Sequence, residues 1–296
     1  MGNSELSRLH PLTLAVYFTV LLGAGAFTVQ PVFAGLSLIG AVMLAIRLCG
    51  REVLKKAPLL LIPLLLAAAI NVLFNHRGVT VLAKLPTGNE ITLEALIYGL
   101  ITGFMLSGAV VWVYCFGKLF TSDKLMCLTG RLFPALTVVI SMTVRFIPLF
   151  ARRFREISAA QAQLGFGISV GGIRRRLRNL ARVFSILISR SLEESIRTAD
   201  SMKSRGYGLS GRSSFHLFRF TMRDAVMIGV VLLLGGYVIY GEIVGMNEFR
   251  CYPRFYMSTV DLRSAAQLCA FGALSLLPAV YELWEDHKWR SLRSKI

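Results

Sequence analysis

The sequence predicts an all-α membrane protein that crosses the bilayer several times. The chain of 296 residues is 55% hydrophobic with a mean hydropathy of +0.62, which is too apolar for a soluble domain. It also contains six runs of 16 to 18 residues without a charged side chain: Leu12–Val29, Pro31–Ile46, Leu59–Phe74, Ile101–Phe116, Ala225–Tyr240 and Ser264–Val280. A spanning helix needs about 20 mostly apolar residues. Most runs reach this length with flanking residues, so we expect about six transmembrane helices.

The formal net charge of +17, from 33 Lys and Arg against 16 Asp and Glu, admits two explanations. A basic protein can bind nucleic acid, whereas in a membrane protein Lys and Arg gather in the cytoplasmic loops. Here the basic residues lie mostly between the predicted spans, and 15 of them fall in the single segment 151–223. We therefore expect contact with the lipid bilayer and no nucleic-acid partner.

The distribution of Lys and Arg among the loops predicts the topology. Segments rich in these residues are assigned to the cytoplasm: 47–58, 117–134, 151–223 and the tail after Val280. The loops 75–91 and 242–263 carry few or balanced charges, so we assign them to the outside. This pattern predicts a multi-pass protein of the cell membrane with both termini in the cytoplasm.

The apolar segment 135–150 lies between two segments that are both assigned to the cytoplasm. One complete span cannot begin and end on the same side, so we expect amphipathic or interfacial helices over 119–150 and leave open whether 135–150 fully inserts. In the external loop 75–91, Pro86-Thr87-Gly88-Asn89 is a turn signal between strand-like flanks. It predicts a short external β-hairpin, which is more typical of a connector than of a ligand site.

These assignments divide the chain into three segments. Residues 1–117 hold the N-terminal transmembrane helices, 118–222 the interfacial and cytoplasmic coupling helices, and 223–296 the C-terminal transmembrane helices with a cytoplasmic tail.

The most informative segment is the basic one. From Val183 to Met202 apolar residues recur at helical spacing, and their stripe includes Leu187, Leu192, Ile196 and Met202. Gly206 suits the left-handed position that ends a helix. Arg205 in the last turn then presents five donors suited to a partner's carboxylates, although a capping cation is the plainer reading.

A second amphipathic helix, Arg145–Ala162, precedes this one. It ends in Gln163-Leu164-Gly165-Phe166-Gly167, which repeats the pattern of Ser204-Arg205-Gly206-Tyr207-Gly208 at an offset of 41 positions. The repeat predicts a docking surface that comes in two copies.

Several kinds of chemistry find no support in the sequence. The five cysteines and four histidines are scattered and form neither a metal-ligand spacing nor a catalytic constellation. The chain has no phosphate-binding G-x-x-x-x-G-K-[ST] loop, and we expect no cofactor. Ion-coupled carriers keep ionisable residues inside their spans. Here the apolar runs are nearly free of them: Glu94 lies near a span boundary, and Arg145 lies in the segment 135–150, whose insertion is left open.

Several short motifs, in order along the chain, resemble one family: Phe74-Asn75-His76-Arg77-Gly78-Val79-Thr80, Asp123-Lys124-Leu125, Arg131-Leu132-Phe133-Pro134, Arg145-Phe146-Ile147-Pro148 and Ser201-Met202-Lys203-Ser204-Arg205-Gly206-Tyr207. The chain is similar over nearly its whole length to the transmembrane T component of energy-coupling factor transporters, the family that includes the cobalt-transport permease subunit.

This resemblance implies a coupling subunit of an ABC importer. Its expected partners are two ABC ATPase subunits, which hydrolyse ATP, and a small membrane substrate-binding subunit, which captures a vitamin or a transition-metal ion. The solute, and whether the module serves one solute or several, are therefore not encoded in this chain. A stand-alone channel or carrier, and a membrane-embedded enzyme, remain as alternatives.

In that family each of two coupling helices ends in an X-Arg-X motif that docks into a groove on one ATPase. The resemblance assigns this role to Ser204-Arg205-Gly206 and to Gln163-Leu164-Gly165. The second of these has Leu164 where the family typically has Arg, which implies one ionic and one non-ionic anchor.

Overall fold

The computed structural model describes residues 5–50, 58–75, 78–84, 90–132, 134–207, 218, 220–247, 249–251, 256–257 and 261–293. The chain forms two compact units, one made of 1–125 with 218–296 and the other of 126–217. The first and last of the three segments predicted from the sequence thus contribute to one unit. The division into three segments itself stays a prediction.

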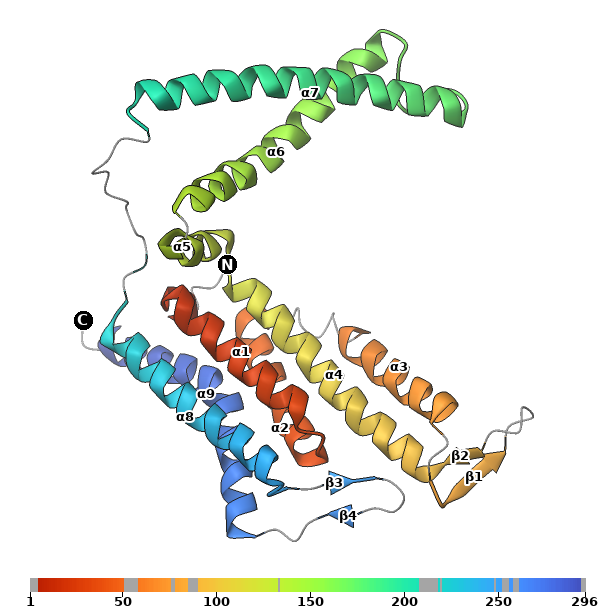
Figure 1. Cartoon of the computed structure of the whole chain (residues 1–296), viewed down its shortest axis with the longest axis vertical. Coiled ribbons are helices and arrows are strands. Elements are labelled where there is room, and N and C mark those ends of the chain that lie inside the picture. Colours follow the sequence, from red (N-terminus) through yellow and green to blue (C-terminus); the bar gives the residue numbers. More distant parts are fainter. Residues whose placement is uncertain are drawn as a thin grey trace. The chain divides into compact units, whose positions relative to one another are not determined.

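The first unit is a bundle of antiparallel helices (Figure 1). Its described helices are η1 (Glu5–Arg8), α1 (Pro11–Phe27), α2 (Pro31–Cys49), α3 (Pro58–Phe74), α4 (Leu93–Leu119), α8 (Met222–Val244) and α9 (Leu262–Arg293). In the described part of the chain, four helices are long and apolar enough to cross a membrane: α2, α4, α8 and the Leu262–Glu285 part of α9. Two shorter apolar helices lie at Pro11–Phe27 and Leu61–Phe74. The protein is therefore an all-α, multi-pass membrane protein.

Aromatic side chains fill the centre of this bundle. Tyr17 and Phe18 of α1 meet Trp112 of α4 edge to face, with ring centroids 6.3 and 6.1 Å apart. The Tyr17 hydroxyl, buried among apolar residues, donates a hydrogen bond of 3.1 Å to the carbonyl of Leu274 in α9. Helices distant in sequence are thus joined through one core.

Helices α3 and α4 approach each other through two glycines. Gly99 and Gly103 have the G-x-x-x-G spacing, which lets membrane helices pack closely. A methyl group at Gly99 would lie 3.0 Å from the Cα of Ala68, and one at Gly103 would lie 2.9 Å from the carbonyl oxygen of Leu64. The short α3 is thereby held directly against the backbone of α4.

Asp224 at the start of α8 ties that helix to the start of α1. Its Oδ2 completes a capping box with Thr221, and its Oδ1 accepts hydrogen bonds from the His10 N–H at 3.0 Å and the Thr13 hydroxyl at 3.1 Å. Since η1 also packs against α9, the first and last described helices meet at one end of the bundle (Figure 1).

The opposite end of the bundle carries two short strand pairs. Strand β1 (Val81–Lys84) pairs antiparallel with β2 (Glu90–Thr92), the segments that flank the predicted turn, while Pro86-Thr87-Gly88-Asn89 lies outside the described residues. Strand β3 (Phe249–Arg250) pairs with β4 (Tyr256–Met257), which the sequence did not predict because both strands have only two residues. That this end faces outside stays a prediction.

The second unit contains most of α5 (Ser122–Leu132), then α6 (Pro134–Gln163) and α7 (Ile173–Ser204). The sequence predicted interfacial helices over 119–150 and an amphipathic helix over Arg145–Ala162, and the structure has one helix, α6, that covers both 135–150 and Arg145–Ala162. Pro148 lies inside this helix, although proline removes one backbone hydrogen bond there. Helix α7 begins ten residues before the stripe predicted from Val183.

Candidate functional site

Helices α6 and α7 end in the same backbone conformation. Gly165 and Gly206 adopt the left-handed region, with φ of +82° and +74°, where a side chain would be strained. Their N–H groups donate to the carbonyls of Ala162 and Lys203 at 3.0 and 2.9 Å. In each case the next residue, an aromatic one, donates its N–H to the carbonyl five residues earlier: Phe166 to Gln161 at 2.9 Å and Tyr207 to Met202 at 3.0 Å. Both ends are Schellman caps.

The shared cap places Leu164 and Arg205 at the same structural position, 41 residues apart. Both are exposed, as are their neighbours Gln163 and Ser204, and Leu164 is 66% exposed. Among the described residues no acid forms an ion pair with Arg205. The six residues predicted to dock thus form two matched helix tips, one apolar and one cationic.

The two helices pack antiparallel over a small apolar core. Ile157 of α6 is buried against Val183 and Leu187 of α7, and the rings of Phe154 and Phe184 lie 5.6 Å apart. We call α6, the connecting loop and α7 the α6–α7 hairpin. Its core fixes which faces of the two helices remain available to other molecules.

The tip of α6 also rests on α7. The Arg182 guanidinium lies 4.1 Å from the centroid of the Phe166 ring, a cation–π contact. The side-chain amide of Asn179, which is 3% exposed, donates a hydrogen bond of 3.0 Å to the carbonyl of Gly167. The position of the Leu164 tip is therefore set by the first half of α7.

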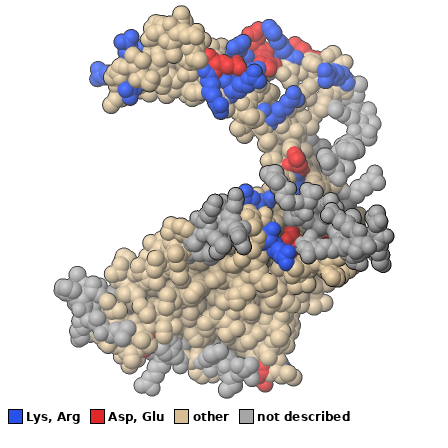
Figure 2. Space-filling view, turned by 180° about the vertical axis from the view of Figure 1, so that it is seen from behind, with Lys and Arg blue, Asp and Glu red and all other residues tan. Residues whose placement is uncertain are grey.

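An ion pair joins the helices where they cross. Arg153 of α6 pairs with Glu194 of α7, and their side chains are 15% and 41% exposed. Within each helix a second pair flanks it: Arg152 with Glu156 at 3.0 Å and Glu193 with Arg197 at 2.6 Å. These six side chains, with Leu149 and Arg190, line a groove of about 680 Å³. Figure 2 shows the charged residues of both signs gathered on this unit.

The charged residues at the crossing are related by the same offset of 41 positions that relates Leu164 to Arg205. Each of Arg152, Arg153 and Glu156 has its counterpart 41 positions later in Glu193, Glu194 and Arg197, with the opposite sign every time. The helices run antiparallel, and Arg153 pairs with its own counterpart, Glu194. Eleven residues, about 16 Å of helix, separate the pair from each tip. The tips lie on opposite sides of the crossing at equal distances.

This crossing was not predicted from the sequence. The offset of 41 was apparent at the glycines, but Glu194 and Arg197 were only expected to lie on the face of the helix opposite its apolar stripe. Comparing the charges at the same offset would have revealed the inverted signs. The contact between Arg153 and Glu194 is a tertiary one, however, and helical periodicity cannot predict it.

The predicted apolar face of α7 divides into two parts. Leu187 is 9% exposed and belongs to the hairpin core, whereas Leu192 and Ile196 are 61% and 65% exposed and Met202 is half-buried. Ile188, 56% exposed, extends the same surface. The second half of α7 therefore presents a stripe of exposed apolar side chains that do not belong to the hairpin core.

Among the buried charged groups of the described residues, Glu94, Lys124 and Asp224 lie near helix starts, whereas Glu282 and Glu285 are buried within α9. Glu94, at the start of α4, accepts a hydrogen bond from the Thr80 N–H at 3.2 Å, and Asp224 caps α8. Lys124, at the start of α5, is 2% exposed, and its burial lowers the pKa of the ammonium group to about 8. Within the described part of the chain no three His, Cys, Asp or Glu residues cluster as a metal site would require.

Comparison with known proteins identifies the family. The model of the CbiQ family, described as cobalt transport protein, matches residues 2–217, from the N-terminal helices through the α6–α7 hairpin. The chain belongs to this family. CbiQ-family membership thus covers both helix tips and the charged crossing between them.

Three curated relatives carry the name energy-coupling factor transporter transmembrane protein EcfT. The relative from Bacillus selenitireducens is 28% identical over 178 residues, 53% of this chain and 66% of its own length. Those from Lactobacillus helveticus and Exiguobacterium sibiricum are 30% and 29% identical over 35% and 36% of this chain, and 38% and 40% of their own lengths. The chain therefore spans just under two thirds of the first relative and about two fifths of the others.

Proposed function

We propose that this CbiQ-family protein is the transmembrane coupling subunit of an energy-coupling factor ABC importer. It links ATP hydrolysis by two partner ATPases to uptake of a vitamin or transition-metal ion through a small substrate-binding membrane subunit. The observation that carries this proposal is the pair of matched tips placed symmetrically about the Arg153–Glu194 crossing. Two equivalent attachment points on one rigid hairpin suit two similar partners.

The two attachments differ in chemistry. At one tip the Arg205 guanidinium offers charge-assisted hydrogen bonds to carboxylates in an ATPase groove. At the other tip Leu164 offers apolar contact only. The flanking residues Gln163 and Gly165, and Ser204 and Gly206, shape each tip through the cap. The protein itself is not an enzyme in this proposal, and both ATPases supply the hydrolysis.

The exposed stripe of α7 supplies a third contact. Leu192, Ile196 and Met202 would meet the substrate-binding subunit or the interfacial region of the bilayer, because an exposed apolar stripe of this kind is typical of an interaction surface.

The test of this function is co-purification from native membranes. We expect the tagged chain to retain two ATPase subunits and one small membrane protein. The isolated chain should transport nothing alone in vesicles, and uptake should appear only when all partners and ATP are present. Uptake by the isolated chain would contradict the coupling role and favour a stand-alone channel or carrier.

We propose further that α1, α2, α3, α4, α8 and α9 all cross the membrane, with both termini and the α6–α7 hairpin in the cytoplasm. In a variant without its five native cysteines, a cysteine at Ser169, in the hairpin loop, should resist an impermeant thiol reagent in intact cells. A cysteine at Val81, in β1, should react. The two positions are matched because both are exposed. Reaction at position 169 from outside would reverse the orientation.

A further inference from the structure

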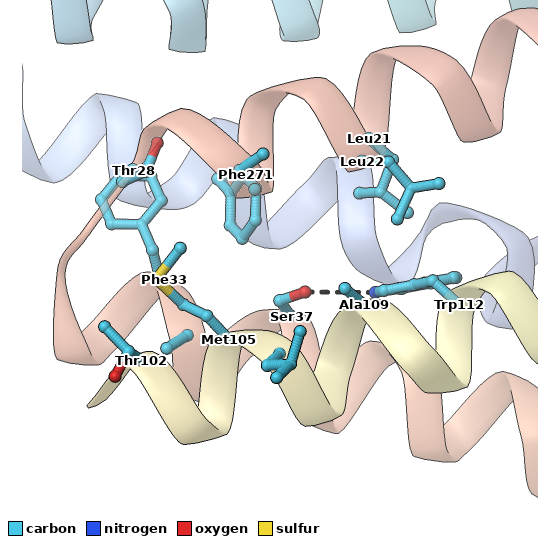
Figure 3. Close-up of a pocket in the computed structure, with 14 residues that line it drawn as sticks. Leu21, Leu22, Thr28, Phe33, Ser37, Thr102, Met105, Ala109, Trp112 and Phe271 are labelled. Atoms are coloured by element: carbon cyan, nitrogen blue, oxygen red, sulfur yellow. Dashed lines mark hydrogen bonds between the residues drawn. The ribbon is translucent and has the colours of Figure 1, made fainter. Parts of the chain in front are cut away.

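A cavity of about 290 Å³ opens among α1, α2, α4 and α9 of the bundle (Figure 3). Three aromatic residues form its floor: Phe33, Trp112 and Phe271 line the cavity and are each at most 1% exposed. Ala26 of α1 and Leu106 of α4 line it as well and are exposed at the surface of the bundle. The cavity therefore reaches from the core toward the lateral surface between α1 and α4.

The polar groups of this cavity are already engaged within the protein. The Thr28 hydroxyl donates to the Ala24 carbonyl at 2.9 Å, and the Thr102 hydroxyl donates to the Tyr98 carbonyl at 2.9 Å. The Ser37 hydroxyl accepts the indole N–H of Trp112 at 3.1 Å, as Figure 3 shows. Buried water needs two to four polar partners. Because the other lining side chains are apolar apart from the Trp112 indole N–H, the cavity offers few further polar partners to water or to a polar solute.

An apolar cavity of this size gains by being filled. An empty one forfeits the dispersion contacts of its lining, and apolar cavities of about 150 Å³ stay dry and bind hydrocarbons such as benzene. The medium around membrane-spanning helices is itself hydrocarbon, in the acyl chains of lipids. We propose that this cavity is a binding site for one acyl chain of a bilayer lipid, which enters between α1 and α4.

Two glycines of α1 provide a matched pair of test substitutions. Gly25 lines the cavity and Gly23 does not, and a Cβ at either position would meet no atom within 4 Å. Gly25→Leu therefore places a side chain in the space assigned to the acyl chain. Gly23→Leu makes the same change in the same helix outside that space. Both gain equally from the loss of a helical glycine.

Trp112 in the floor supplies the readout. The chain has three tryptophans, so Trp284→Phe and Trp289→Phe leave Trp112 as the sole indole. This full-length reference would be placed in phosphatidylcholine vesicles whose acyl chains carry bromine, a contact quencher of tryptophan fluorescence. We expect most of the Trp112 emission to be lost relative to unbrominated vesicles. Gly25→Leu should restore most of it, and Gly23→Leu should restore none.

Two results would overturn the site. Unquenched emission in the reference would mean that no lipid chain enters, leaving the cavity empty or filled by a protein partner. Equal quenching in the reference and in Gly25→Leu would mean that bromine reaches Trp112 by another route. If Gly25→Leu does not assemble, Ala109→Leu fills the same cavity from α4 and is judged by the same two criteria.

Discussion

Replacing Arg205 by alanine is expected to detach one ATPase from the complex. Arg205 is the only cation at the two tips, and its guanidinium is exposed at a rigid helix end. Truncating one partner of a desolvated, hydrogen-bonded charge pair commonly costs about 2–5 kcal/mol. This corresponds to a roughly 30- to 4,000-fold weaker affinity. The measurement is ATPase retention on the purified complex, together with solute uptake.

The matched control is Leu164→Ala at the equivalent position of the other tip. It removes apolar contact and no charge, so we expect a smaller loss of ATPase binding. Arg205→Lys separates charge from geometry, because lysine keeps the charge but lacks the planar fork of donors. Unchanged assembly, ATP hydrolysis and uptake in Arg205→Ala would remove the docking role from this residue.

Reversing one charge of the crossing should uncouple hydrolysis from transport. Arg153→Glu places two carboxylates against each other between α6 and α7, where the native pair holds the helices together. Like-charge contacts cost up to several kcal/mol at interfaces. Because Glu194 is 41% exposed, water screens part of the repulsion, and we expect a loss on the order of 1 kcal/mol. The population of molecules in which α6 and α7 are separated at this contact would rise about fivefold. We therefore expect less uptake per ATP hydrolysed.

The double variant Arg153→Glu with Glu194→Arg restores an ion pair of inverted polarity and should recover coupling. Arg152→Glu is the matched control. It reverses a charge one residue away, but Arg152 is 80% exposed and pairs within its own helix. If the double variant is no better coupled than Arg153→Glu alone, the interhelical pair does not set the geometry of the tips.

The sequence predicted most of the bundle, because each long apolar run in a membrane protein corresponds to one helix. It also placed the end of α7 correctly, since Gly206 serves a backbone conformation that few other residues adopt. The continuity of α6 was not predicted, because the change from an apolar to a basic pattern near Arg145 looks like a boundary. Periodicity reports which face is apolar, but not where one helix ends and the next begins.

The charged crossing and the cavity were beyond prediction for a different reason. Arg153 and Glu194 meet only because α6 and α7 fold back on each other, and Gly25 meets open space only because three other helices surround it. Such features depend on how helices are placed relative to one another. A single sequence carries this information only indirectly, here as an offset of 41 residues.

The contacts along the α6–α7 hairpin make it a spacer of fixed length. The helices are fastened at the Arg153–Glu194 pair and again where Asn179 and Arg182 hold the loop after α6, so neither helix can pivot about a single point. The span between the Leu164 and Arg205 tips is then constant. Two ATPases attached to such a spacer cannot move apart at their points of attachment. In the proposed complex, opening and closing of the ATPases would tilt the hairpin as a whole, and the membrane helices would receive that tilt.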